Sequence, residues 1–329
     1  MDRKPIISMI FLAMMLLAYT GAQAQMAVPE MVPSGPSFYH TQFLAMPMSL
    51  NYLPPNPAVI QWGAPNRGGG GWMRGKTHDD VYGDAEKKEA QGQYTGGRFV
   101  REKYALAAQL GWFSLTYPLP AQSTINHSSA GLSFVTLDNL AIGLSRTRSH
   151  QLNDTQTSDL EVFMDTSTIG GSMRFSELFF VGLGYGKDTL NINDFMGGKA
   201  RGTRNFSMGG LGIRSAGAVL WRVEISKTNK PNFTDARGKR VGDGYDHTQG
   251  SLEIGFANMV FGYTSYGAVT TAAGTGEETK LSGSIADFAF TPPAGIAISG
   301  RRERSKVDLP GLPEAKYETI NSLAVNVQF

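Results

Sequence analysis

The sequence predicts an all-β fold: a transmembrane, antiparallel, up-and-down β-barrel of fourteen strands, with twelve as the alternative, and an N-terminal plug segment. Three observations lead to this prediction. Segments of alternating apolar and polar residues recur after residue 100, and very short turns alternate with longer polar connections. No apolar run after Ala24 is long enough to form a membrane-spanning helix. A barrel tolerates this composition, including its 40 glycines, because only every second strand residue meets lipid.

The first segment of the chain has the features of an export signal. Arg3 and Lys4 precede an apolar run from residue 6 to residue 18, and Ala22-Gln23-Ala24 supplies the small residues of a cleavage site. We therefore expect a signal peptide at 1–24. The chain has no cysteine, which excludes a lipoprotein anchor and a disulfide framework. A net charge of +2 gives no reason to expect a nucleic-acid partner.

The next segment, 25–57, is predicted to be a plug or periplasmic segment, ahead of a barrel at 58–329. Residues 25–55 hold six prolines beside Phe38, Tyr39, Phe43, Leu44 and four methionines. Proline excludes regular strand ladders, and so much apolar surface is unfavourable in water. An ordered segment inside the lumen would bury that surface. A disordered linker is the alternative, because prolines and chain termini both favour disorder.

Five short turns join strand pairs beyond residue 128. They are expected at Asp138-Asn139, Ser176-Glu177, Ser215-Ala216-Gly217, Ala257-Asn258 and Pro292-Pro293, where Asx, Gly and Pro favour turns. Longer polar connections are expected at 148–167, 188–203, 229–245, 267–279 and 305–317. Short turns at one end and long loops at the other are typical of outer-membrane barrels, which keep the short turns in the periplasm.

The strand count depends on the residues before 103. Fourteen strands require a strand at Ala58–Arg74 and another at Gly92–Val100, with a turn at Arg101-Glu102; otherwise the count is twelve. We favour fourteen because this turn resembles the other short turns.

Alternation within the strands predicts which side chains face the lumen. In residues 218–228, Trp221 and Val223 share one face, while Arg222 and Glu224 share the other. An arginine facing lipid at mid-depth costs about 2–4 kcal/mol, so the charged face should be the inner one. The predicted lumen-lining set is Arg174, Arg222, Glu224, Glu253 and Arg301. These residues could line a solute path or form an interior salt-bridge network, and the sequence leaves both open.

Three segments do not alternate cleanly. The apolar set changes parity between Met208 and Leu211, between Ile285 and Phe288, and near Gly111. We expect β-bulges at Gly209-Gly210, at Ala286-Asp287 and at Gly111. Outward aromatic side chains are expected to form interfacial belts, from Tyr104, Trp112, Trp221, Tyr263 and Tyr317.

The last strand ends on an aromatic residue. Apolar side chains at 323, 325, 327 and 329 alternate with small or polar ones. This strand resembles the closing strand of bacterial outer-membrane barrels, and the resemblance implies that Phe329 is read by the barrel-assembly machinery.

Asn56-Pro57-Ala58 follows the proline-rich segment, and here the chain resembles the FadL family of long-chain fatty-acid and hydrocarbon channels. In that family an Asn-Pro-Ala motif lies where the plug passes into a fourteen-stranded barrel. The chain is shorter than usual for the family, and Met46-Pro47-Met48-Ser49 stands where a glycine-rich stretch normally precedes the motif. The resemblance implies passive uptake of hydrophobic molecules, which would bind between plug and wall and leave sideways into the membrane.

Other motifs have weaker contexts. Residues 70–77 fit a phosphate-loop pattern, but no strand–loop–helix context surrounds them, so we expect a glycine-rich hairpin loop. Loop residues could activate water in a surface hydrolase, if an aspartate meets a histidine. Those candidates are His78, Asp79, Asp80, Asp243, Asp246 and His247. His127 beside Ser128 is expected at a turn, and the histidine spacing gives no metal site.

The function we expect is a channel in the cell outer membrane for small hydrophobic molecules such as fatty acids or hydrocarbons, without enzyme activity and without a cofactor. A general diffusion porin or a structural barrel is the alternative, and the surface hydrolase is the third. Expected partners are outer-membrane lipid, the assembly machinery and a small hydrophobic ligand.

Overall fold

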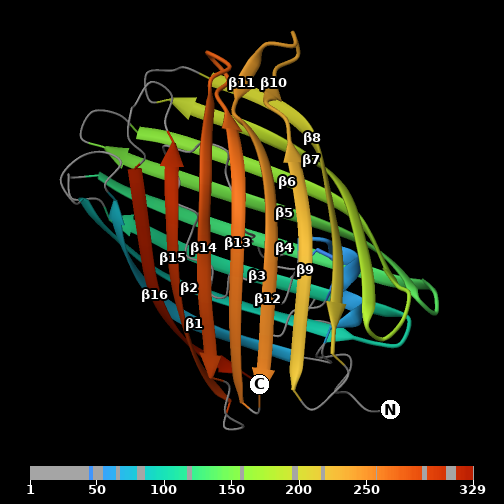
Figure 1. Ribbon diagram of the computed structural model, residues 1–329. Helices are drawn as coiled ribbons and strands as arrows, with labels where there is room; N and C mark the ends of the chain where they lie inside the picture. The colour runs from blue at the N-terminus through green and yellow to red at the C-terminus, as the bar shows by residue number, and fades with distance from the viewer. Residues whose placement is uncertain are drawn as a thin grey trace, which may run out of the picture.

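A computed structural model describes most of the chain. The described residues are 44–46, 55–63, 67–79, 86–116, 121–155, 159–194, 199–215, 219–256, 258–290, 295–308 and 316–328. Figure 1 shows them as long strands lying side by side, with one short helix among them. The predicted signal peptide and Phe329 lie outside the described residues. Among those described, no helix is long and apolar enough to cross a membrane.

The described residues form one 3₁₀-helix and sixteen strands. The helix is η1 (Pro57–Trp62). The first eight strands are β1 (Arg67–Asp79), β2 (Glu86–Val100), β3 (Tyr104–Thr116), β4 (Ala121–Leu137), β5 (Leu140–Thr155), β6 (Asp159–Arg174), β7 (Phe179–Asp194) and β8 (Lys199–Arg214). The others are β9 (Leu220–Lys230), β10 (Phe233–Thr234), β11 (Arg240–Gly242), β12 (Gly244–Phe256), β13 (Met259–Thr271), β14 (Glu278–Phe290), β15 (Ile296–Asp308) and β16 (Lys316–Gln328).

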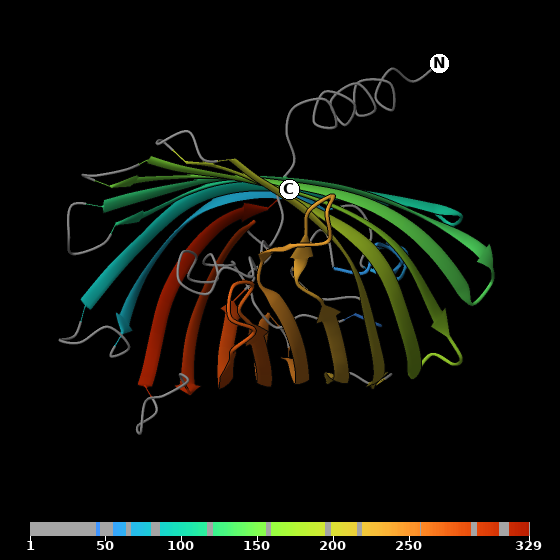
Figure 2. The same cartoon turned by 90° about the horizontal axis from the view of Figure 1, so that it is seen from above.

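The fourteen long strands form a closed antiparallel ring. β1 pairs with both β2 and β16, and β8 pairs with β9, so the sheet returns to its start. The short strands β10 and β11 form a hairpin between β9 and β12, attached to the ring through Thr234 and Thr203. Closure satisfies backbone N–H and C=O groups without a free edge, as a membrane-spanning sheet requires. Figure 2 shows the strands surrounding the lumen, with the blue η1 inside them.

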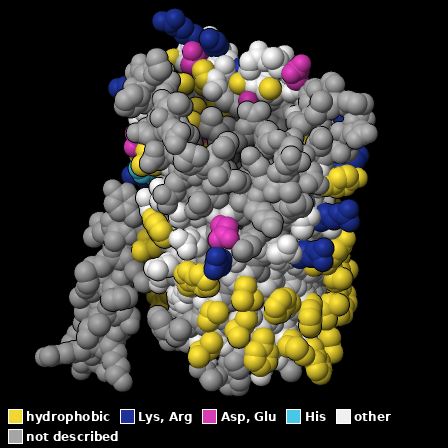
Figure 3. Space-filling view, turned by 90° about the vertical axis from the view of Figure 1, so that its left-hand side faces the viewer, with side chains coloured by type: hydrophobic (Ala, Val, Ile, Leu, Met, Phe, Trp, Pro, Cys, Tyr) yellow, Lys and Arg dark blue, Asp and Glu magenta, His cyan; other side chains and the backbone are white. Residues whose placement is uncertain are grey.

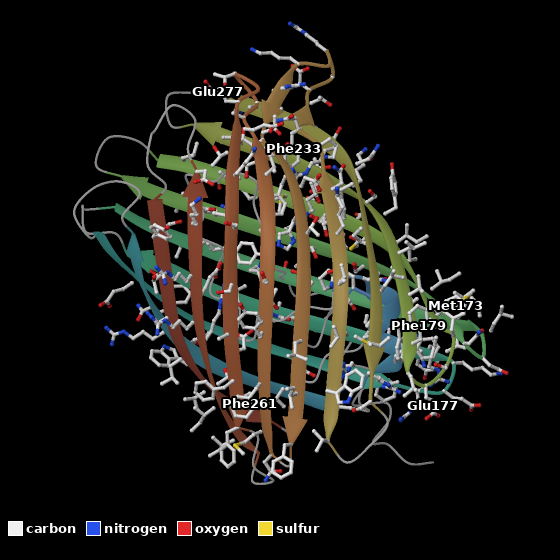
Figure 4. The ribbon with its side chains drawn as sticks, viewed as in Figure 1. Met173, Glu177, Phe179, Phe233, Phe261 and Glu277 are labelled. Atoms are coloured by element: carbon white, nitrogen blue, oxygen red, sulfur yellow. The ribbon has the colours of Figure 1, made fainter. Side chains whose placement is uncertain are left out.

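Two ends of the barrel differ, as the sequence predicts. The short-turn end carries the tight connections at 101–103, 138–139 and 175–178. The opposite, long-loop end carries the β10–β11 hairpin. Figure 4 shows Phe233 and Glu277 at the long-loop end, and Met173, Glu177, Phe179 and Phe261 at the short-turn end. The turns predicted at Asp138-Asn139, Ser176-Glu177 and Arg101-Glu102 are confirmed. Residues 216–218, 257 and 291–294 lie outside the described part.

The long polar connections are shorter than predicted. Residues 148–155 and 159–167 belong to β5 and β6 rather than to a loop, and β7, β8 and β13–β16 also run into the expected loops. The polar composition misled the prediction because strands that rise above the membrane have water on their outer face. Polar alternation then looks like a loop although the ladder of hydrogen bonds continues.

The strand expected at Ala58–Arg74 is wrong over its first half. Residues 57–62 form η1, and β1 begins at Arg67. The reason is local: the Asn56 side chain accepts a hydrogen bond from the Ala58 N–H at 3.2 Å, and Pro57 occupies the first helical position. Asn at the N-cap and Pro at N1 both favour a helix start. Residues 70–77 lie within β1 and do not form the glycine-rich hairpin loop that the sequence predicts.

The three predicted bulges are also wrong. β8 pairs with β7 without a register shift through Gly209 and Gly210, and β14 pairs continuously through Ala286 and Asp287. β3 is likewise continuous through Gly111. Strict alternation therefore points Phe206 and Met208 into the lumen, where both are buried, while Leu211 and Ile213 face outward and are exposed. Apolar inward residues, rather than bulges, explain the changed parity.

The outer wall is apolar near the short-turn end. Its exposed side chains include Leu183 on β7, Ile225 on β9 and Phe261 on β13. The predicted belt aromatics Tyr104, Trp112, Trp221, Tyr263 and Tyr317 are all at least 39% exposed, as an outward position requires. Figure 3 shows hydrophobic side chains gathered in the lower half of one face, with Lys and Arg side chains above them. This outer band is what a barrel presents to lipid.

Candidate functional site

The candidate site is the lumen and the inner segment that lies in it. The inner segment consists of the described residues 44–46 and 55–63. Ala45, Met46, Ala58, Val59 and Ile60 have no exposed surface. η1 packs against β2 to β6, and its Gln61 side chain donates to the Arg101 carbonyl at 2.6 Å, so the segment lies near the short-turn end.

Glycines on the inner face of the wall make room for this segment. A Cβ added to Gly143 would overlap the Ala58 backbone nitrogen, and one added to Gly182 would overlap the Leu44 carbonyl. In the same way, Gly170 faces the Asn56 side chain. The close approach of two backbones requires the absence of a side chain at these positions. The pattern explains why β5, β6 and β7 carry inward glycines although Gly weakens a strand.

Asn56, the first residue of the predicted motif, joins three parts of the structure. Its Nδ2 donates to the Leu44 carbonyl at 2.8 Å and to the Gly171 carbonyl of β6 at 3.1 Å. Its Oδ1 accepts from the Ala58 N–H. Pro57 and Ala58 are both buried in η1. The motif therefore sits at the junction of the inner segment, the helix start and the barrel wall.

Glu224, one of the predicted lumen residues, binds the inner segment through its backbone. The carboxylate accepts hydrogen bonds from the N–H groups of Leu44, Ala45 (2.9 Å) and Met46 (3.3 Å). The side chain is 1% exposed. Hydrogen bonds to a buried charged acceptor are stronger than neutral ones. On the opposite side, the Ser172 hydroxyl of β6 donates to the Ala45 carbonyl at 3.0 Å. Residues 44–46 are thus held from both β9 and β6.

The other predicted lumen residues form ion pairs or ring contacts. Arg222 pairs with Glu253 across β9 and β12, and Arg301 pairs with Glu303 on β15. All four side chains are buried. Arg174 is only half-buried, and its guanidinium lies 5.2 Å from the centre of the Trp62 ring, at the short-turn end. Three of the five predicted residues, Arg222, Glu253 and Arg301, are therefore in buried ion pairs, whereas Glu224 binds the inner segment and Arg174 contacts Trp62.

A second charged group, which the sequence analysis missed, lies towards the long-loop end. Asp188 Oδ2 is 2.8 Å from Arg204 Nε and 3.4 Å from Lys230 Nζ, and its Oδ1 accepts from the Thr166 hydroxyl at 2.7 Å. Neither Asp188 nor Arg204 has any exposed side-chain surface. Asp188 and Lys230 fell in expected loops. The signal that could have found Asp188 is the alternation that continues past it through Leu190 and Ile192.

Apolar groups lie on both sides of this charged group. Towards the long-loop end, Phe233 of β10 packs with Ile125, Val162, Met164 and Leu190. The Arg204 guanidinium stands 4.0 Å from the Phe233 ring.

Towards the inner segment, Leu44 packs with Phe206 and Met208 in a second group, called here the inner apolar group. The Lys230 ammonium is 4.4 Å from the Phe206 ring. The lumen therefore alternates between apolar and charged layers, whereas a simple water-filled barrel interior is polar.

The loop residues suggested for hydrolysis do not assemble into a catalytic pair in the part described. Asp243 accepts from the Ala273 N–H at 2.7 Å, and Asp246 pairs with Lys227 at 3.1 Å. The His247 ring lies between the rings of Tyr245 and Tyr266.

The remaining polar candidates give no site among the described residues. His127 is buried within β4, 3.1 Å from the Ser149 hydroxyl, and is not at a turn. The side chains of His78 and Asp79, and all of Asp80, lie outside the described residues. Within the described ranges, no three His, Cys, Asp or Glu residues are placed to hold a metal ion.

A closed antiparallel barrel with an apolar outer band and a chain segment held inside it defines a class: the fold is that of outer-membrane β-barrel channels. Three solved structures show this fold, each with about a tenth of the residues identical. The Ralstonia pickettii toluene transporter TbuX has a TM-score of 0.54 at 10% identity, covering 88% of this chain and 96% of that one. A Pseudomonas aeruginosa FadL homologue has a TM-score of 0.52 at 10% identity, and the match covers 85% of this chain and 95% of that one. The CymD monoaromatic hydrocarbon channel has a TM-score of 0.52 at 10% identity, and the match covers 84% of this chain and 91% of that one.

The chain thus resembles FadL-type outer-membrane channels in fold, as the Asn-Pro-Ala motif predicts. No protein-family model matches the sequence, and no curated protein matches it.

Proposed function

We propose that this protein is an outer-membrane channel for the passive uptake of small hydrophobic molecules, such as fatty acids or hydrocarbons. The observation that carries the proposal is the inner apolar group, where Leu44 of the inner segment meets Phe206 and Met208 of the wall. These residues place an apolar surface at the boundary between segment and wall, next to the charged layer of Asp188, Arg204 and Lys230. Such a surface favours an apolar ligand over a hydrophilic one.

The fold and its neighbours support this assignment. The solved structures of similar fold carry names that describe channels or transporters of hydrocarbons. In an outer membrane the short-turn end would face the periplasm. The inner segment would then lie near the exit of the lumen, and the β10–β11 hairpin near its entrance. Phe329 keeps its proposed role as an assembly signal.

Binding of a neutral hydrophobic probe tests the proposal. The purified protein in nonionic detergent would be titrated with naphthalene, which is uncharged and fluorescent. Met208→Gln places a polar amide in the inner apolar group, and we expect affinity to fall about fivefold, on the order of 1 kcal/mol. The matched control is Met208→Leu, which keeps the site apolar and should bind within about twofold of wild type. Equal binding by the Gln and Leu variants would contradict the proposed site.

The alternatives predict other results. A general diffusion porin passes a hydrophilic solute regardless of the polarity at Met208. A structural barrel neither binds naphthalene nor conducts. Both outcomes would remove the inner apolar group from any role in transport.

A further inference from the structure

A second candidate site lies on the outside of the barrel. It is a groove of about 810 Å³ that crosses β2 to β7. Its lining comprises Gln93, Thr95, Leu110, Gly111, Trp112, Asn126, His127, Ser128, Arg148, His150, Phe163, Asp165 and Asn191. We call it the outer-wall groove. None of its lining residues belongs to the inner apolar group of Leu44, Phe206 and Met208.

Strand register shows that eleven of the thirteen lining residues point outward, whereas Gly111 and His127 have the inward parity of buried Ser149. On β5, Ile142 and Leu144 are exposed while Gly143 lies under the inner segment, and Arg148 and His150 continue the outward parity. Residues that lie directly opposite on paired strands share a face. One outward row is Gln93, Trp112, Asn126, His150, Phe163 and Asn191; the adjacent row is Thr95, Leu110, Ser128, Arg148 and Asp165.

The groove begins where the outer wall changes from apolar to polar. Counting outward rows from the short turns, Leu144, Ile169 and Tyr185 stand opposite one another and are about half exposed. The next outward row is Arg146, Ser167 and Lys187, and the groove follows directly above it. Apolar rows face lipid tails, so the first charged row marks the level of the headgroups.

The chemistry of the groove fits a phosphorylated sugar. Aromatic faces at Trp112 and at Phe163, which stacks on His150 at 4.2 Å, offer flat apolar surfaces for the C–H face of a sugar ring. Asn126, Gln93 and Asn191 add amide donors and acceptors along the same row. This mixture differs from a surface for acyl chains, which would be uniformly apolar.

The charges at the lower edge favour an anionic group. Arg148 Nε is 2.9 Å and Arg146 Nη2 is 3.6 Å from the same oxygen of Asp165, and exposed Lys187 stands two strands from Arg146. His150 interacts with Glu161 at 2.9 Å. The three cations Arg146, Arg148 and Lys187 therefore outnumber the carboxylates of Asp165 and Glu161. The Arg146 side chain is 65% exposed. Arginine and lysine in this setting bind phosphate.

We propose that the outer-wall groove binds the headgroup of a phosphorylated glycolipid of the outer leaflet, of the lipid A type. The sugar ring packs on Trp112 and Phe163, and the phosphate lies at Arg146 and Lys187. The inference rests on the outer-membrane location and not on the transport function.

Native mass spectrometry of the detergent-solubilised protein with added lipid A tests this. We expect the wild type to retain one lipid A, and Trp112→Ala/Phe163→Ala and Arg146→Gln/Lys187→Gln each to retain it about tenfold more weakly. The matched control, Tyr263→Ala/Lys227→Gln, removes one aromatic and one cation from the outer wall away from the groove and should bind like wild type. Heat-dependent gel mobility would establish that every variant is folded.

Three results would overturn the proposal. Equal loss of lipid A in the groove and control variants would indicate general attraction to the wall. Equal retention of phosphatidylglycerol would show that any anionic lipid suffices, so no sugar is recognised. A dimer whose formation depends on Trp112 would mean that a second copy of the chain occupies the groove.

Discussion

The two faces of one strand, β9, contrast most clearly. Outward Trp221, Val223 and Ile225 are exposed, while inward Arg222 and Glu224 are buried. The outward residues share one partner, lipid, and need only be apolar. The inward residues each have a particular partner: a carboxylate on β12 for Arg222, and three backbone N–H groups of the inner segment for Glu224. The outer face therefore requires only that its residues be apolar, because all of them meet lipid. The inner face requires residues that match particular partners.

The largest expected effect comes from breaking the outer face. Val223→Arg would place a charge in the apolar outer band, and we expect the free energy of unfolding in lipid to fall by about 2–4 kcal/mol. Urea titration of the reconstituted barrel, followed by tryptophan fluorescence, measures this. The control is Lys227→Arg on the same strand and face, where a charge already stands. A loss below that of the control would show that Val223 does not face lipid.

A slightly smaller effect is expected from breaking an inner contact. Glu224→Ala removes the acceptor for three buried N–H groups, which costs about 1–3 kcal/mol in docking the inner segment. Protease cleavage near residues 44–46 should become faster, while the barrel itself stays folded by gel mobility. Thr264→Ala serves as the control, because Thr264 is an inward, buried residue of β13 whose hydroxyl contacts Ser251 and not the inner segment. Unchanged protection of the segment in Glu224→Ala would show that the carboxylate does not hold it.

The glycine positions sharpen the same contrast. Gly182→Ala would force a Cβ against the Leu44 backbone, and we expect a loss of about 1–3 kcal/mol from overpacking. Gly171→Ala on β6 has open space around its added Cβ and should change stability by less than about 0.5 kcal/mol. Chemical unfolding of the two variants side by side gives the comparison. Equal losses would mean that glycine is needed for the strand itself and not for the inner segment.

The smallest effect is expected at an exposed ion pair. Arg74 and Glu89 lie 2.8 Å apart on the outer wall, with about half of each side chain exposed. Such pairs contribute about 0–1 kcal/mol, so Arg74→Ala should shift the urea midpoint only slightly, and less in high salt. A large shift would place this pair in a drier environment than its exposure indicates.

The sequence predicted the outer face better than the inner one, for a physical reason. Outward residues such as Trp221 and Ile225 repeat with period two because lipid acts on every strand alike. Inward Phe206 and Met208 broke that pattern, and a bulge was predicted where the structure has an apolar lumen contact with Leu44. Leu44 lies far from Phe206 and Met208 in the sequence, so no local pattern predicts their contact.

The same limit applies to the candidate site. Glu224 could be placed in the lumen from alternation, but its role in holding residues 44–46 depends on a pairing 180 residues apart. A family resemblance predicts that Asn56-Pro57-Ala58 lies at the passage into the barrel, whereas the hydrogen bonds of Asn56 to Leu44 and Gly171 depend on the fold. Asp188 and Lys230 were assigned to loops because strands above the membrane have a polar outer face.

Uptake across an outer membrane tests the central claim most directly. A Gram-negative host that lacks its own hydrophobic channel would produce the wild type or Met208→Gln, and uptake of a labelled long-chain fatty acid would be compared with that of a hydrophilic sugar. The account predicts that wild type raises fatty-acid uptake and leaves sugar uptake unchanged, and that Met208→Gln lowers the fatty-acid rate alone. Sugar uptake without fatty-acid uptake, or no uptake of either, would contradict it.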